Sequence, residues 1–319
     1  MSTVRSIQFD SFRTSSGAVY SPIEIHYQHF GQPIADSPVV LIHHSLTGDS
    51  NVAGKFGWWK RVVGDNKSIN TQKYAVIAFN ILGNGIKGQT FKNYKDFHLG
   101  DIAEAIKRGL QILGVTRLYA SIGGSIGGGL VWEMASKYPD FSKHIIPVAA
   151  NWKASGWIIA NTFIQHRILK NSSDPLVDAR MHAMMTYRNP LSIEQRFNRE
   201  YNEEKQIYQV ENWLLGHGRK LSQRYSLDAY IMMNHLLGSI DFARDGRPLE
   251  DIIKSISSTI HIISIDSDQL FTLWEDVEIV ETIRRFKKRV IHYQINSKHG
   301  HDAFLIEYDQ IENILNKIF

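Results

Sequence analysis

The sequence predicts an α/β fold: a mainly parallel sheet with helices on both faces and an inserted helical lid. Three observations predict it. Short β-rich runs alternate with helical stretches in the first half and the last fifth of the chain, which is typical of βαβ units. A glycine-rich turn joins one expected strand to one expected helix. Between roughly 153 and 257 the alternation stops, and consecutive helices are expected instead.

The expected elements follow in chain order. Residues 1–30 are expected to form an opening antiparallel hairpin, because the run EIHYQHF at 24–30 alternates polar and apolar side chains. Later strands are expected at about 38–44, 74–80, 117–123, 144–150, 259–265 and 288–294, and helices at 128–138, 275–285 and before Phe319. We expect 1–152 and 258–319 to form one core domain.

The segment 153–257 is expected to form an all-helical lid above the carboxyl ends of the strands. Helix breaks are predicted near Asn171–Pro175, Asn189–Pro190 and Gly216–Gly218, where helix-breaking residues gather. Such a lid would bury a site at the sheet edge and shape a substrate pocket.

Residues 123–127 read Gly-Gly-Ser-Ile-Gly and fit the G-x-S-x-G nucleophile elbow between a strand and a helix. The small neighbours allow a sharp turn that would lift the Ser125 hydroxyl above the sheet. The same turn would aim the N–H of Ile126 at a developing oxyanion. The alternative is a tight packing turn without catalytic function.

A catalytic serine needs a base and an acid, which in α/β-hydrolase folds follow it in the order acid, then histidine. Asp266 and Asp268 follow the expected strand 259–265, and His299 and His301 follow the next strand. We favour Asp268, which lies deeper in its loop, and His301, which follows a glycine near a helix start. The alternative makes these residues helix caps and solvated loop histidines.

A second oxyanion donor is expected in the loop after the strand 38–44, where the N–H of Leu46 is the candidate. The alternative is a simple turn at Gly48 and Asp49.

Composition excludes several classes of protein. The chain has 319 residues, 43% of them hydrophobic and 21% charged, as in soluble globular proteins. No run of about 18 apolar residues could span a bilayer, the N-terminus has no apolar signal core, and cysteine is absent, so a cytoplasmic location is expected. The net charge of +4 is scattered, which argues against nucleic acid. No metal-binding spacing appears, and no permanently bound cofactor is expected.

Several motifs together resemble the homoserine O-acetyltransferase family of the α/β-hydrolase superfamily, and the resemblance runs through most of the chain. They are the oxyanion loop HSLTGDS at 44–50, GWW at 57–59, NILG at 80–83, the elbow IGGSIGG at 122–128, the acid loop DSDQLF at 266–271 and GHDAF at 300–304. In the acid loop the aspartate before Gln-Leu-Phe is the family's triad member, which supports Asp268. The motif GHDAF supports His301.

The resemblance implies acetyl transfer from acetyl-CoA, as co-substrate, to the hydroxyl of L-homoserine in methionine biosynthesis. Arg180 and Tyr187 are seven residues apart, nearly two helical turns, so they share one helix face. The family resemblance assigns them to the acceptor site, together with Asp302 of the histidine motif. It also implies a homodimer that forms through the lid. The alternative makes Arg180 a surface residue and Tyr187 a packed one.

Two segments depart from the family pattern. Residues 84–90 (NGIKGQT) replace a glycine- and serine-rich stretch that ends in proline, and 224–230 (RYSLDAY) only loosely match the lid motif. Three alternatives therefore stay open: a succinyl donor or serine acceptor, a plain serine esterase, and a non-catalytic binding protein.

Overall fold

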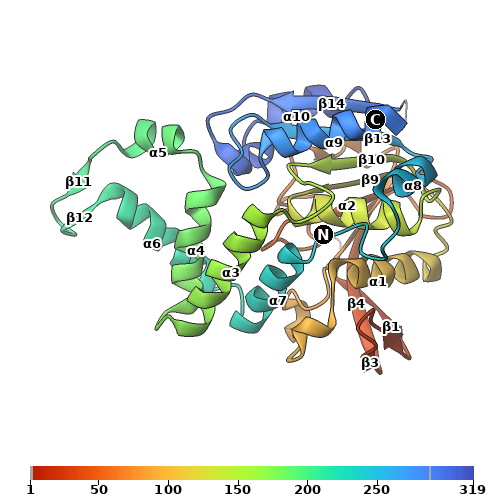
Figure 1. Ribbon diagram of the computed structural model, residues 1–319, viewed down its shortest axis with the longest axis horizontal. Coiled ribbons are helices and arrows are strands. Elements are labelled where there is room, and N and C mark those ends of the chain that lie inside the picture. Colours follow the sequence, from red (N-terminus) through yellow and green to blue (C-terminus); the bar gives the residue numbers. More distant parts are fainter. Residues whose placement is uncertain (1–2, 287–288) are drawn as a thin grey trace.

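A twisted central sheet organises the molecule in the computed structural model, which describes residues 3–286 and 289–319 (Figure 1). In these residues eight strands form one sheet in the order β1-β4-β8-β5-β9-β10-β13-β14. The strands from β8 to β14 run parallel, while β4 is antiparallel to β8 and β1 is antiparallel to β4. The mainly parallel sheet predicted from the sequence is therefore confirmed.

The strands lie within about two residues of their predicted positions. The six parallel strands are β5 (Val39–His43), β8 (Ala75–Phe79), β9 (Leu118–Gly124), β10 (Ser142–Val148), β13 (Thr259–Ile265) and β14 (Val290–Ile295). The opening hairpin is confirmed as β1 (Arg5–Phe9) paired with β4 (Ile23–Gly31), with the short strands β2 (Phe12–Arg13) and β3 (Val19–Tyr20) between them. Positions 1, 2 and 288 of the predicted strands lie outside the described residues.

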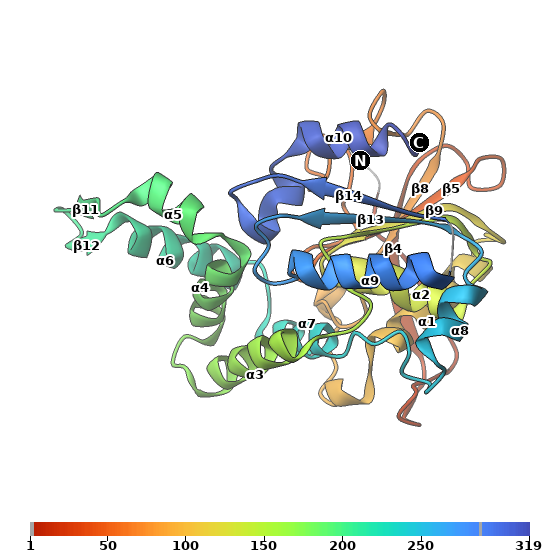
Figure 2. The same ribbon diagram turned by 45° about the horizontal axis from the view of Figure 1, so that its top comes forward.

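Helices cover both faces of the sheet (Figure 2). One face packs against α1 (Leu99–Ile112), α2 (Ile126–Lys137), α8 (Leu249–Ser255) and α9 (Leu273–Phe286), and the other against α10 (Tyr308–Leu315). Because both faces are covered, the inner strands are apolar throughout: every residue of β5 and β8 is buried. This arrangement leaves the carboxyl ends of the strands as the open edge for a site.

The lid projects from that edge (Figure 1). It contains α3 (Gly156–Asn171), α4 (Pro175–Tyr187), α5 (Pro190–Phe197), α6 (Gln209–Ser222) and α7 (Leu227–Gly238). The predicted breaks at Asn171–Pro175 and Asn189–Pro190 separate α3, α4 and α5. The lid is not all-helical as predicted, because β11 (Tyr201–Asn202) and β12 (Ile207–Tyr208) form a small antiparallel hairpin.

The predicted break at Gly216–Gly218 is wrong, because both glycines lie inside α6. Close helix packing explains Gly218. A β-carbon there would lie 2.6 Å from Cγ1 of Val177 and 2.8 Å from its carbonyl oxygen on α4. Glycine at this position therefore lets two lid helices approach, at the usual cost in helix propensity.

Residues 3–286 and 289–319 contain neither a membrane-spanning helix nor a metal-binding cluster. No helix there is long and apolar enough to cross a membrane. No group of three or more histidine, cysteine, aspartate or glutamate side chains is placed to hold a metal ion.

Candidate active site

Ser125 occupies a strained turn between β9 and α2. Its backbone has φ 60° and ψ −129°, a conformation that non-glycine residues rarely adopt and that collects at functional sites. The turn is tight: a β-carbon on Gly123 would lie 2.5 Å from the Gly127 backbone, and one on Gly127 would lie 2.5 Å from the carbonyl oxygen of His43. Both glycines are therefore required where the elbow passes the end of β5.

Asp268 and His301 meet at the carboxyl ends of β13 and β14. Asp268 follows β13, and His301 lies in the 3₁₀ helix η3 (Gly300–Leu305) after β14. The Nδ1 of His301 is 2.7 Å from Oδ2 of Asp268. The other carboxylate oxygen, Oδ1, accepts the N–H groups of Leu270 at 2.7 Å and Phe271 at 3.0 Å. These two backbone bonds hold the carboxylate so that its second oxygen faces the imidazole.

The carboxylate makes the imidazole more basic. Burial alone lowers the pKa of His301, but the charge of Asp268 and its hydrogen bond outweigh burial and raise that pKa above its usual range. Both residues are buried, with Asp268 5% and His301 3% exposed. The ring therefore presents Nε2 toward the cavity with Nδ1 held by the acid, as a general base requires.

Asp266 and His299, the alternative candidates for the acid and the base, make their contacts outside the cavity. Asp266 accepts the N–H of Ser297 at 2.9 Å near the surface. The Nδ1 of His299 lies 3.2 Å from the Ser192 hydroxyl and 3.3 Å from the Arg188 guanidinium. Neither residue reaches the imidazole–carboxylate pair.

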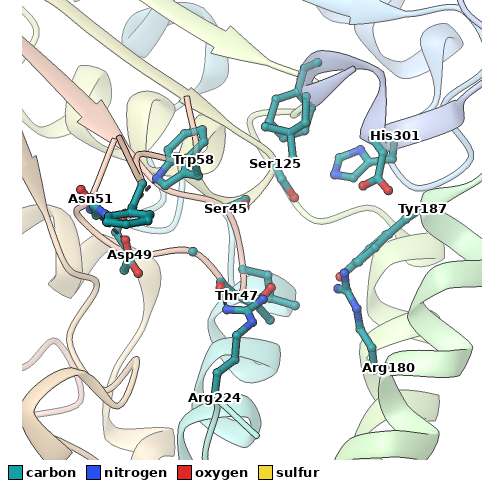
Figure 3. A pocket seen from close by; sticks show the side chains of 16 residues that line it. Ser45, Thr47, Asp49, Asn51, Trp58, Ser125, Arg180, Tyr187, Arg224 and His301 are labelled. Carbon is teal, nitrogen blue, oxygen red and sulfur yellow. Dashed lines mark hydrogen bonds between the residues drawn. The ribbon is translucent and has the colours of Figure 1, made fainter. Parts of the chain in front are cut away.

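One cavity of about 320 Å³ contains both Ser125 and His301. Figure 3 shows their side chains facing one another, with Arg180 and Tyr187 on one wall and Asp49, Asn51 and Trp58 on the opposite side. Its floor is the sheet edge and its roof is the lid. The cavity is lined by Ser45, Leu46, Thr47, Gly48, Asp49, Asn51, Phe56, Trp58, Ser125, Arg180, Tyr187, Arg224, His301, Asp302, Phe304 and Leu305.

Two backbone N–H groups remain available beside the serine. Ile126 is the first residue of α2, where an N–H has no intrahelical acceptor. Leu46 lines the cavity, and its N–H makes no hydrogen bond to any part of the chain that the structure describes. The structure thus places the two predicted oxyanion donors on elements that converge on Ser125.

The predicted acceptor residues line the same cavity. The guanidinium carbon of Arg180 lies 5.4 Å from the centre of the Tyr187 ring, so the two residues do share one face of α4. Within 3–286 and 289–319, Arg180 has no carboxylate at salt-bridge distance. Asp302 instead pairs with Arg188, 3.3 Å from Nε to Oδ2. Burial raises the pKa of Asp302, opposed by the charge of Arg188.

Arg224 lines the cavity although sequence reasoning did not select it as a site residue. It belongs to the loosely matching lid segment 224–230 and donates from Nη1 to the carbonyl oxygen of Thr47 at 2.9 Å. Only the fold brings the connection between α6 and α7 next to the loop after β5, so spacing along the chain carried no signal for this contact.

The fold is that of the α/β hydrolases, and the site places Ser125 of a nucleophile-elbow turn in one cavity with His301. The model of the α/β-hydrolase fold family matches residues 38–306, and the chain belongs to that family.

Within that fold the chain belongs to the homoserine O-acetyltransferase family. A homoserine O-acetyltransferase of Symbiobacterium thermophilum is 32% identical, with 95% of this chain and 90% of the relative covered. One from Carboxydothermus hydrogenoformans is 27% identical, with 98% and 93% covered. The family resemblance expected from the motifs is therefore confirmed.

Solved structures of the same fold include both transferases and esterases. Homoserine O-acetyltransferase from Bacillus anthracis superposes with a TM-score of 0.90 at 19% identity, covering 100% of this chain and 97% of its own. Esterase E22 superposes with a TM-score of 0.89 at 19% identity, covering 100% of each chain. At this identity the likeness shows the fold alone, and the fold is shared by enzymes of both names.

Proposed function

We propose that this protein is a homoserine O-acetyltransferase of methionine biosynthesis. It would transfer acetyl from acetyl-CoA to the hydroxyl of L-homoserine through a seryl acyl-enzyme. The observation that carries this proposal is the guanidinium of Arg180, which has no carboxylate partner among the described residues and lines the same cavity as Ser125. A plain ester needs no such cation, whereas the α-carboxylate of an amino acid does.

The first half-reaction acylates the serine. Ser125 attacks the thioester carbonyl while its proton passes to Nε2 of His301. The N–H groups of Leu46 and Ile126 stabilise the tetrahedral oxyanion. Asp268 keeps the proton on Nδ1 and stabilises the imidazolium. As the intermediate collapses, the imidazolium gives its proton to the CoA sulfur, and the acetyl group stays on Ser125.

The second half-reaction runs the same steps with a different nucleophile. His301 takes the proton of the homoserine hydroxyl, the oxygen attacks the acetyl-serine carbonyl, and Ser125 leaves with the proton returned by His301. In this proposal Arg180 holds the homoserine carboxylate, Tyr187 packs beside it, and Asp302 attracts the ammonium group. Water competes as a nucleophile, so the lid must keep it from the acyl-enzyme.

Mass spectrometry after mixing the protein with acetyl-CoA alone tests the proposal. The expected result is one acetyl group on the peptide that contains Ser125, removed on addition of homoserine with formation of O-acetyl-homoserine. Rates with acetyl-CoA and succinyl-CoA, each with homoserine and with serine, decide the donor and the acceptor. Cleavage of a short aryl ester without stimulation by any amino acid would instead identify an esterase.

Removal of the Arg180 guanidinium is expected to affect only the second half-reaction. Arg180→Ala should leave acyl-enzyme formation from acetyl-CoA nearly intact and raise the homoserine KM, since an unpaired buried carboxylate costs about 2–5 kcal/mol. Lysine should rescue poorly, because it keeps the charge but loses the two-pronged geometry. Steady-state kinetics for homoserine, and the lifetime of the acetyl adduct, give the readout.

Arg219→Ala, an exposed arginine on α6 outside the cavity lining, is the matched control. It should change neither half-reaction. If Arg180→Ala blocks acylation and spares the homoserine KM, the arginine serves the CoA side or the fold, and the acceptor does not bind beneath α4.

We also propose that the protein is a homodimer that pairs through the lid and acts in the cytoplasm. The exposed face of α3 supports the dimer, since Trp157, Ile159, Phe163 and Ile164 are 51%, 53%, 64% and 45% exposed, and apolar side chains gathered on a surface mark an interaction site. Light scattering should give twice the chain mass for the wild type. Phe163→Asp should give a monomer, and an unchanged mass would place the interface elsewhere.

A further inference from the structure

His44 directly follows β5 and is the first residue of the oxyanion loop, and its imidazole is fully buried. Its Nε2 accepts the N–H of Ile81 at 3.0 Å, so that nitrogen carries the lone pair. The proton must then be on Nδ1, which lies 2.7 Å from the carbonyl oxygen of Ser45 and donates to it. Burial lowers the pKa of His44, which favours this neutral ring.

The Ser45 carbonyl belongs to the peptide unit that carries the Leu46 N–H. It accepts a second hydrogen bond from the N–H of Gly48 at 2.9 Å, so two donors fix its direction. A trans peptide is planar, with C=O and N–H pointing in opposite directions. Holding the carbonyl toward the His44 ring therefore turns the Leu46 N–H to the opposite side of the loop.

The other oxyanion donor is held in the same way by the helix. The Ser125 carbonyl shares its peptide unit with the Ile126 N–H, and it accepts from Gly128 at 2.8 Å and Gly129 at 3.1 Å. On this side α2 supplies both donors to the carbonyl. At the Ser45 carbonyl the loop backbone supplies one donor, the N–H of Gly48, and the His44 side chain supplies the second.

A buried polar network holds the ring in place. Asn84 Nδ2 lies 3.3 Å from Nε2 of His44 and 3.1 Å from Oδ1 of Asn80. Asn80 in turn accepts the N–H of Ser50 at 3.0 Å and donates to its hydroxyl oxygen at 2.9 Å. The network links the loop after β8 to both ends of the oxyanion loop, so the ring cannot rotate without breaking several buried hydrogen bonds.

We propose that His44 is a positioning residue for the oxyanion hole: its Nδ1–H orients the Ser45–Leu46 peptide so that the Leu46 N–H faces the carbonyl attacked by Ser125. The inference rests on the proposed acyl chemistry at Ser125, but not on the identity of the acceptor. It predicts a role in the transition state only, because the oxyanion exists only after attack.

Three replacements separate the two nitrogens of the ring. Asn places an amide N–H where Nδ1 was and loses the Nε2 acceptor; Gln places an acceptor near Nε2 and loses the Nδ1 donor; Leu loses both. Acylation of Ser125 by a chromogenic aryl acetate, followed as a burst, is the readout. The rate constant for acylation should fall least in the Asn variant, more in the Gln variant and most in the Leu variant. The Leu variant should lose about 100-fold, near the lower end of the loss for a missing oxyanion donor.

The KM for the aryl acetate should change by less than about threefold, since the ground-state carbonyl gains little from this donor. His43→Asn is the matched control: His43 is the preceding buried histidine, and its Nε2 lies 3.1 Å from the Ser121 hydroxyl instead of the oxyanion loop. It should acylate within about threefold of the wild type. Thermal melting of each variant reports folding separately from rate.

A His44→Leu variant that folds and acylates at nearly the wild-type rate overturns the proposal, as does Gln outperforming Asn or a loss confined to KM. The wild type gives a test that needs no variant. Nitrogen NMR of its histidines should show His44 protonated at Nδ1 only, and an Nε2–H ring would refute the inference. Absence of homoserine acetylation alongside a normal burst would refute the proposed function and leave this inference standing.

Discussion

Replacing Ser125 with alanine should abolish both the acetyl adduct and turnover while leaving the fold intact. The hydroxyl is the only group removed, and alanine can occupy the same strained turn about as well as serine. Loss of a catalytic serine typically costs about 10⁶-fold in kcat where a full triad operates. Intact-mass spectrometry after mixing with acetyl-CoA, and the rate of thiol release, measure the two losses.

Ser45→Ala is the matched control, because Ser45 is the second serine that lines the cavity. It should still form the adduct at a rate close to that of the wild type. Adduct formation that persists in Ser125→Ala and disappears in Ser45→Ala would mean that the elbow serine is not the nucleophile.

Changing Asp268 to asparagine should cost about 10⁴-fold in kcat, the effect known for this change in other serine triads. The asparagine amide oxygen can still accept the N–H groups of Leu270 and Phe271, so the loop should stay folded. Its NH₂ then faces Nδ1 of His301 and donates to it. The ring proton must move to Nε2, and His301 can no longer accept the proton of Ser125. His301→Ala should cost at least as much, because the base itself is lost.

The neighbouring candidates provide the controls. Asp266→Asn and His299→Ala change residues whose contacts lie outside the cavity, so acylation should fall by less than about tenfold. The reverse ranking would show that the other member of each pair is the catalytic one. The pre-steady-state rate of acylation is the measurement to compare.

The acid limb of the pH–rate profile follows from the same pair. His301 acts as a base only when neutral, and the Asp268 charge raises its pKa above 6.5. The wild-type kcat/KM should therefore decline with acid through a midpoint above pH 6.5.

Local sequence patterns were sufficient to predict the central sheet and the positions of the triad candidates. The buried runs at β5 and β8, the elbow at 123–127 and the order of acid and histidine after two late strands each express a short-range rule. A parallel sheet brings the carboxyl ends of its strands to one edge, so the chain order alone placed Ser125, Asp268 and His301 near one another. The choice of Asp268 over Asp266 was harder, because both follow the same strand and only loop geometry separates them.

Where the sequence failed, contacts between distant segments overrode a local rule. Gly216 and Gly218 resemble a helix break, yet they lie inside α6, and Gly218 is small because α4 packs against it. The hairpin of β11 and β12 carried no pattern strong enough to separate it from its helical neighbours.

The sequence by itself determined the fold class, the nucleophile elbow and the candidates for the triad, because strand periodicity, turn chemistry and chain order are local properties. Only the tertiary structure decided which aspartate reaches the imidazole. It also decided that Arg188 pairs with Asp302, while Arg180 has no carboxylate partner among the described residues. The contact between the His44 ring and the Ser45 carbonyl likewise appears only in the fold. Each of these depends on distances between segments far apart in the chain, and hydrogen bonds and ion pairs act only over such short distances.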